Sequence, residues 1–131
     1  MSVAEHKAQA PAHVKCFVLT VSDTRTEAND TGGQAIRELL ERAGHSISGH
    51  TIVKDDAMQV AAIVRQRLAD SNTQVIITTG GTGISARDTT YEAITQLFEK
   101  RLDGFGELFR MISFNEIGSA AAKWCAMTLR P

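Results

Sequence analysis

The fold is decided by Gln74-Val-Ile-Ile-Thr-Thr-Gly-Gly-Thr-Gly-Ile-Ser-Ala-Arg-Asp-Thr-Thr-Tyr-Glu92. Its apolar start, residues 75–77, predicts a strand buried on both faces of a parallel sheet. Three glycines follow at a density that strand and helix interiors avoid: Gly80, Gly81 and Gly83. Thr89 and Glu92 then have the spacing of a capping box, which predicts the start of a helix. A strand, a glycine-rich turn and a helix start in succession predict a phosphate-binding loop, because free N–H groups and the helix dipole favour an anion.

The alternative is a tight turn that uses glycine for its geometry only. Hydroxyl and charged side chains surround the glycines: Thr78, Thr79, Thr82, Ser85, Arg87 and Asp88. Such groups add little to a turn but suit a phosphorylated ligand with a metal ion. The sequence therefore favours the phosphate-binding interpretation.

Composition places the chain among ordinary soluble proteins. Its 131 residues suffice for one domain with a three-layer core. With 14 basic and 15 acidic residues the net charge is −1, so no general attraction to nucleic acid is expected. The two cysteines lack metal-ligand spacing, and no apolar segment suits a signal peptide or a membrane span. A cytoplasmic protein that does not engage a membrane is expected.

Strand and helix patterns alternate along the chain. Residues 1–13 predict a flexible N-terminal arm, and residues 14–131 form the domain. Strand patterns at 14–21 and 47–54 precede the glycine-rich strand, the second being more polar and nearer an edge. Thr31 and Gln34 predict a capping box for one helix, and Asp56 predicts the N-cap of the next. Three strand–helix units predict an α/β fold, a three-layer αβα sandwich with a mostly parallel sheet.

Polar residues follow all three predicted strands. Ser22 and Asp23 follow the first strand, Asp55 and Asp56 the second, and the glycine-rich loop the third. Because ligands bind beyond the carboxyl ends of parallel strands, these loops are expected to form one site. Asp55 with Asp88 would suffice to hold Mg²⁺ together with ligand phosphates and water. Asp56 is the weaker candidate because it suits a helix cap, and Ser22 and Asp23 could equally be turn formers.

Other polar residues have less specific interpretations. Asp30 is expected to cap a helix or lie in a loop, and His45 and His50 to be solvated at the far end of the sheet. Gly81-x-Gly83-x-x-Ala86 also matches a dinucleotide fingerprint, with Asp103 as its acid. That acid should end a second strand, whereas residues 91–102 have a helical pattern, so a dinucleotide-binding oxidoreductase is the less favoured function.

Several motifs together resemble one family. They are Val21-Ser22-Asp23, Asp30-Thr31-Gly32, Thr78-Thr-Gly-Gly-Thr-Gly83 with Arg87-Asp88, and Gly104-Phe-Gly-Glu-Leu-Phe-Arg110. Over residues 14–121 the chain resembles the molybdenum cofactor biosynthesis protein B family, which is related to molybdopterin adenylyltransferases. The resemblance implies a molybdopterin-binding domain that forms trimers or hexamers.

The resemblance also implies a reaction and residues to perform it. Active members transfer AMP from Mg-ATP to the terminal phosphate of molybdopterin. By motif, phosphates would be bound by Gly80, Gly81, Thr82 and Gly83, with Ser22, Asp23, Thr79 and Ser85 in the same pocket. Asp88 and Asp55 would be the catalytic carboxylates and the Mg²⁺ ligands.

The chain departs from the family pattern at its C-terminal end. After about residue 121 the resemblance ends, and a truncated or divergent C-terminus is expected. Two functions therefore remain open: an adenylyltransferase of molybdenum cofactor biosynthesis, or a non-catalytic pterin-binding or assembly protein.

Overall fold

A computed structural model describes residues 2–81 and 90–117. Within these ranges the elements, in chain order, are α1 (Val3–Gln9), β1 (Lys15–Val21), α2 (Thr31–Arg42), β2 (Ser46–Val53), α3 (Ala57–Leu68), β3 (Val75–Gly80), α4 (Thr90–Thr95) and α5 (Asp103–Ile117). The predicted alternation of strands and helices is confirmed. Helix α1 was not predicted, and α4 is shorter than the helical pattern of residues 91–102 indicated.

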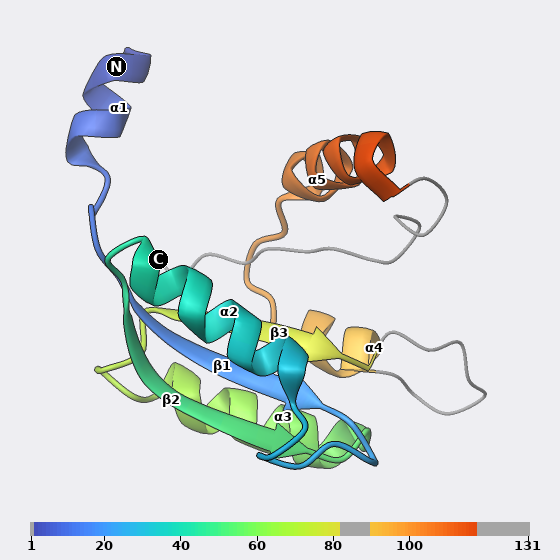
Figure 1. The fold of residues 1–131 in the computed structure, drawn as a ribbon. Coiled ribbons are helices and arrows are strands. Elements are labelled where there is room, and N and C mark those ends of the chain that lie inside the picture. The colour runs from blue at the N-terminus through green and yellow to red at the C-terminus, as the bar shows by residue number, and fades with distance from the viewer. Residues whose placement is uncertain (1, 82–89, 118–131) are drawn as a thin grey trace.

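The described strands form a parallel sheet in the order β2-β1-β3 (Figure 1). Strand β1 pairs with β2 from Lys15↔Ser46 to Val21↔Val53, and with β3 from Cys16↔Val75 to Val21↔Gly80. In this register the carboxyl ends of all three strands are aligned. The loops after β1, β2 and β3 therefore emerge at one edge of the sheet, as the sequence predicted.

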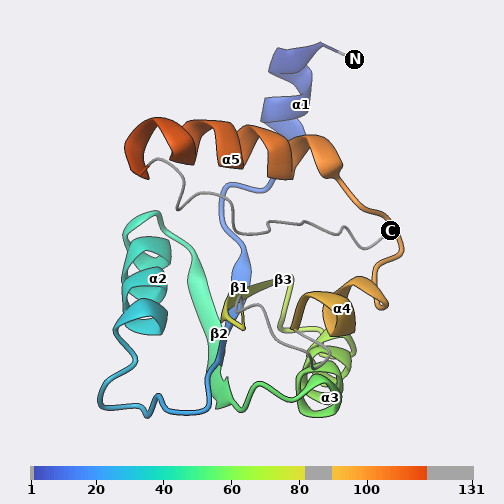
Figure 2. The ribbon, with the colours of Figure 1, turned by 90° about the vertical axis from the view of Figure 1, so that its right-hand side faces the viewer.

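Helices cover both faces of this sheet (Figure 2). Helix α2 lies on one face, while α3 and α4 lie together on the other. The order β2-β1-β3 explains this arrangement. The connection through α2 runs from β1 to β2, and the connection through α3 runs back from β2 past β1 to β3. Because these two right-handed connections run in opposite directions across the sheet, their helices lie on opposite faces. The predicted three-layer α/β architecture is confirmed.

The hydrophobic core lies between the sheet and α3. Alternate residues of β1, namely Phe17, Leu19 and Val21, pack with Val60 and Val64 of α3. Phe17 and Leu19 are completely buried, and each such side chain stabilises the fold by about 1.5–3 kcal/mol. The other face of β1 presents Thr20 toward α2, and this residue belongs to the polar network described below.

Strand β3 is less buried than its apolar sequence predicted. Residues 76–79 are half-buried, and Val75 is 36% exposed. In the described part of the chain β3 pairs only with β1 and so forms one edge of the sheet. The prediction of a strand buried on both faces was wrong for β3; β1 is the strand with that environment.

The helix caps include one correction. Asp30, not Thr31, is the N-cap of α2, and its side chain accepts a hydrogen bond from the Gly33 N–H. Thr31 is already the first helical residue, so the predicted capping box of Thr31 and Gln34 is not formed. The predicted cap of α3 is confirmed, since the Asp56 side chain accepts hydrogen bonds from the N–H groups of Met58 and Gln59.

Candidate functional site

The strand order places a topological switch point between β1 and β3. Chain connections leave β1 toward α2 and leave β3 toward α4, on opposite faces of the sheet. In open α/β sheets this reversal at the carboxyl ends of adjacent strands is where ligands bind. The loop after β1 and the Gly80-Gly81 turn at the end of β3 flank this position, with the start of α2 beside them.

Ser22 shapes the first of these loops. Its N–H donates to the Val53 carbonyl at 2.8 Å, which fastens the end of β1 to the end of β2. Its hydroxyl oxygen accepts the N–H groups of Thr24 and Arg25 at 3.2 and 3.0 Å. The interpretation of Ser22 as a turn former is therefore correct, and a role in ligand binding remains a prediction.

Asp23 and Asp55 come together from different loops. The Asp55 N–H donates to Oδ1 of Asp23 at 3.2 Å. This contact joins the loop after β1 to the loop after β2, as expected from their shared edge. Asp55 is half-buried, whereas Asp56 is exposed and its Oδ1 caps α3. The two neighbouring carboxylates thus have different environments.

The start of the glycine-rich loop has a backbone that only glycine adopts readily. Gly80 and Gly81 have φ angles of 86° and 63°, and no other residue in the described ranges except Gly44 has a positive φ. A Cβ added to Gly80 would collide with the Val21 carbonyl oxygen across the β1–β3 pair. Gly80 is therefore needed for close approach as well as for its turn.

The first turn of α2 lies against this strand end. A Cβ added to Gly32 would lie 3.9 Å from Oγ1 of Thr79, the residue that precedes Gly80. Gly32 is exposed, and its N–H makes no hydrogen bond to any residue in the described ranges. An exposed N–H at the positive end of a helix is a group that binds anions. The sequence prediction did not include this helix start in the site.

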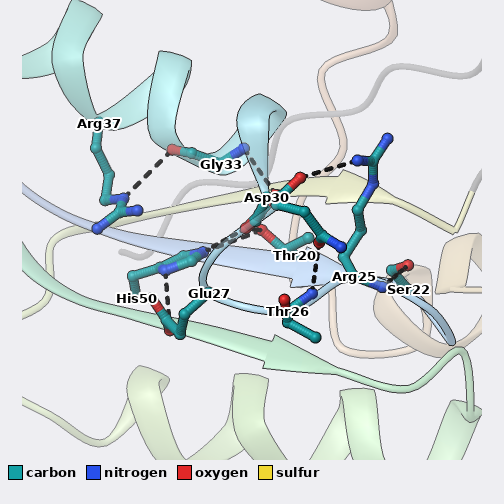
Figure 3. Close-up of polar contacts among 10 residues, drawn as sticks. Thr20, Ser22, Arg25, Thr26, Glu27, Asp30, Gly33, Arg37 and His50 are labelled. Carbon is teal, nitrogen blue, oxygen red and sulfur yellow. Dashed lines mark hydrogen bonds and ion pairs between the residues drawn. The ribbon is translucent and has the colours of Figure 1, made fainter.

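A buried polar network holds the start of α2 (Figure 3). Oδ1 of Asp30 accepts the Gly33 N–H at 3.1 Å, and Oδ2 accepts the Thr20 hydroxyl at 2.7 Å. Nε2 of His50 lies 2.9 Å from the same Oδ2, and the His50 side chain is only 5% exposed. A Cβ at Gly33 would collide with Asp30 and lie 2.7 Å from Oγ1 of Thr20, so the network requires glycine there.

The network corrects the expectation for the histidines. The side chain of His50 in β2 is buried and contacts Asp30, and His45 is half-buried with its Nδ1 accepting the Val14 N–H at 3.1 Å. The prediction that both are solvated was wrong. Parallel register explains His50: Thr20 pairs with Ile52, so His50 lies two residues away on the same face of the sheet.

The environment of Asp30 favours its charged form. Burial by itself would raise the pKa of this carboxyl, but hydrogen bonds from Thr20 and Gly33 together with the neighbouring His50 outweigh burial and lower the pKa from its usual value. Asp30 is therefore an ionised carboxylate at neutral pH. A negative charge at a helix N-terminus stabilises the helix but repels an anionic ligand.

The remaining predicted site residues lie outside the described ranges: Thr82, Gly83, Ser85 and Asp88. Among the residues that are described, no group of three or more histidine, cysteine, aspartate or glutamate side chains could hold a metal ion. A Mg²⁺ ion at Asp55 would accordingly need ligand phosphates and water as its other ligands, which is how proteins commonly bind it. Asp103 is the first residue of α5 and does not end a strand, which argues against the dinucleotide fingerprint.

Comparison with known proteins agrees with this geometry. Residues 17–127 match the family described as a probable molybdopterin binding domain. The molybdenum cofactor biosynthesis protein B of Bacillus subtilis is 52% identical over 122 residues, which are 92% of this chain and 72% of that protein. The protein of the same name from Bacillus cereus is 51% identical over 122 residues, which again are 92% of this chain and 72% of that protein.

Solved structures give the same result. A crystal structure of a molybdenum cofactor biosynthesis protein B superposes with a TM-score of 0.80 at 48% identity, over 88% of this chain and 72% of that one. A molybdopterin biosynthesis enzyme from Thermus thermophilus gives 0.74 at 29% identity, over 88% of this chain and 75% of that one.

The fold and the match over most of the chain define a molybdopterin-binding domain of the α/β class. Within that class the chain belongs to the molybdenum cofactor biosynthesis protein B family. This membership supports a role in the biosynthesis of the molybdenum cofactor. No helix in residues 2–81 or 90–117 has both the length and the apolar character needed to cross a membrane.

Proposed function

We propose that the protein is a molybdopterin adenylyltransferase that transfers AMP from Mg-ATP to the terminal phosphate of molybdopterin. A phosphate oxygen of the pterin attacks the α-phosphate of ATP, and pyrophosphate leaves. The observation that carries the proposal is the meeting of three groups at one sheet edge: the joined Asp23 and Asp55 loops, the Gly80-Gly81 turn and the start of α2. Phosphoryl chemistry of this kind needs mainly positioning and charge neutralisation.

The residues of this edge have distinct proposed roles. The N–H groups of Gly80, Gly81, Thr82 and Gly83 bind phosphate oxygens, and Ser22, Asp23, Thr79 and Ser85 line the pocket. Asp55 and Asp88 would hold Mg²⁺, which would neutralise charge on the reacting phosphates. Asp55 is favoured over Asp56 because its backbone joins the loop that contains Asp23, whereas the Asp56 side chain forms the N-cap of α3.

The test is molybdopterin-dependent release of pyrophosphate from Mg-ATP. We expect release by the parent chain and a loss of about 100-fold or more in Asp88→Asn and Asp55→Asn, since each removes a charge close to the reacting phosphates. Asp56→Asn is the matched control, because asparagine caps a helix as well as aspartate does. It removes an equal charge one residue away and should retain activity. Normal turnover by Asp55→Asn, or loss in Asp56→Asn alone, would contradict the assignment.

The second candidate is a non-catalytic pterin-binding or assembly protein. It is favoured by the same cradle, because binding requires the glycine turn and the helix start but not Asp88. Binding of molybdopterin by the parent chain without any release of pyrophosphate would support this candidate. Release that depends on molybdopterin would exclude it.

We further propose that the protein assembles as a homotrimer or homohexamer in the cytoplasm. The support lies in α5, whose large apolar side chains are 41–60% exposed: Phe105, Leu108, Phe109, Met111 and Ile112. Exposed apolar surface of this kind is typical of contacts between subunits, and we take a second copy of the chain as its partner.

A further inference from the structure

His50 has no role in the proposed reaction, yet its environment is unusual. It lies in the middle of β2, 5% exposed, with Nε2 against Asp30 and Nδ1 3.7 Å from Oε1 of Glu27. That distance is too long for a hydrogen bond, and Nδ1 has no hydrogen-bond partner among residues 2–81 and 90–117. A buried polar atom without a partner costs free energy, so the position of the ring calls for a compensating function.

The charge of Asp30 determines which atom donates in the hydrogen bond between His50 and Asp30. An ionised carboxylate can only accept, so Nε2 must carry the proton that faces Oδ2 of Asp30. The Thr20 hydroxyl donates to the same oxygen at 2.7 Å. Two donors thus hold Oδ2 on the sheet side of the helix start, and only Oδ1 is left for the helix, where it accepts the Gly33 N–H.

Without these donors the carboxylate has a second helix partner. An N-cap side chain can accept the N–H of either the second or the third helical residue, here Gly32 or Gly33. Gly33 is taken by Oδ1, and the exposed Gly32 N–H makes no hydrogen bond to the described residues. A released Oδ2 would reach for the N–H group of Gly32, the residue whose Cβ position lies 3.9 Å from Oγ1 of Thr79.

We propose that His50 is a positioning residue for the phosphate site: its Nε2–H holds the Asp30 carboxylate away from Gly32, which leaves the start of α2 open to a ligand phosphate. The effect of His50 on ligand binding rests on the proposed phosphate site, whereas the contact of His50 with Asp30 does not. Besides Asp30, the charged groups around the ring are Glu27 and, on α2, Arg37, whose Nε donates to the Gly33 carbonyl at 3.4 Å (Figure 3).

The binding test uses Mg-pyrophosphate as the probe, titrated by calorimetry. His50→Leu removes the donor and should weaken binding by about tenfold or more, because the lost hydrogen bond is to a charged group and the freed carboxylate competes with the ligand. His50→Gln keeps a donor at a similar reach and should bind within about threefold of the parent. His45→Leu, which loses a hydrogen bond at the opposite end of the sheet, is the matched control and should bind as the parent does.

Equal binding by His50→Leu and the parent would overturn the proposal. So would equal weakening by leucine and glutamine, because the ring's shape rather than its donor would then matter. Should His50→Leu not fold, Thr20→Val serves in its place, since it removes the other donor to Oδ2 while keeping the side-chain shape.

A second measurement separates this inference from the proposed function. Nitrogen-15 NMR of the parent should show a proton on Nε2 of His50, and hydrogen exchange at the Gly32 amide should be fast in the parent and slowed in His50→Leu. A proton on Nδ1 alone, or unchanged exchange at Gly32, would overturn the positioning role even if pyrophosphate binds. If the parent does not bind pyrophosphate, the proposed function fails, and the NMR result still decides the role of His50.

Discussion

At the scale of single residues, Gly32 and Gly33 differ in whether there is space for a Cβ atom. A Cβ at Gly33 collides with Asp30, whereas a Cβ at Gly32 meets Thr79 only at an ordinary 3.9 Å. We expect Gly33→Ala to destabilise the fold by about 1–3 kcal/mol through overpacking. Gly32→Ala should be neutral or stabilise it by up to about 1 kcal/mol, because alanine favours helix. Urea unfolding measures both, and similar effects in the two variants would show that the buried network does not restrict Gly33.

Asp30 gives a prediction for pH dependence at the same scale. Its pKa is lower in the folded protein than in the unfolded chain, so its contribution to stability is complete above the unfolded value and is lost as the pH falls through the folded value. The stability difference between the parent and Asp30→Asn should be constant near neutral pH and shrink below about pH 4. Urea unfolding at a series of pH values tests this. A difference that grows toward acid pH would mean that the carboxyl is protonated in the folded state.

At the scale of elements, sequence and structure disagree about one helix start and agree about another. The Asp56 side chain caps α3, and Thr31 is exposed and caps nothing. Asp56→Ala should lower the free energy of unfolding by about 1 kcal/mol, while Thr31→Ala should change it by less than about 0.5 kcal/mol. Thermal unfolding of the pair decides the point. An equal loss of unfolding free energy in Thr31→Ala would show that Thr31 does form the capping box that the sequence predicted.

At the scale of the whole molecule, α5 stands apart from the sheet (Figures 1 and 2), and several of its apolar side chains are exposed. If copies of the chain meet there, Leu108→Glu should shift the sedimentation coefficient toward that of a single chain, because a charge cannot be buried unpaired in an interface. Leu39→Glu is the control, since Leu39 is an exposed leucine of α2, 62% accessible. A sedimentation coefficient unaffected by Leu108→Glu would place the contact between copies elsewhere.

The sequence alone determined the alternation of strands and helices, the parallel sheet and the edge at which the polar loops gather. These follow from signals within a few residues of one another: apolar runs, glycine pairs and capping side chains. It also indicated the family, through the glycine-rich loop and the motifs around it. The turn residues Gly80 and Gly81 were predictable because their conformation is a property of the local backbone.

Only the tertiary structure decided the environments of His50, Asp30 and β3. Thr20, Asp30 and His50 are separated by 10 to 30 positions in the sequence, and no periodic pattern joins them. The β1–β2 register brings Thr20 and His50 to the same face of the sheet, and the first turn of α2 then adds Asp30. A buried polar network is fixed by pairing across the sheet and by helix packing, so its members look like ordinary surface residues until the chain is folded.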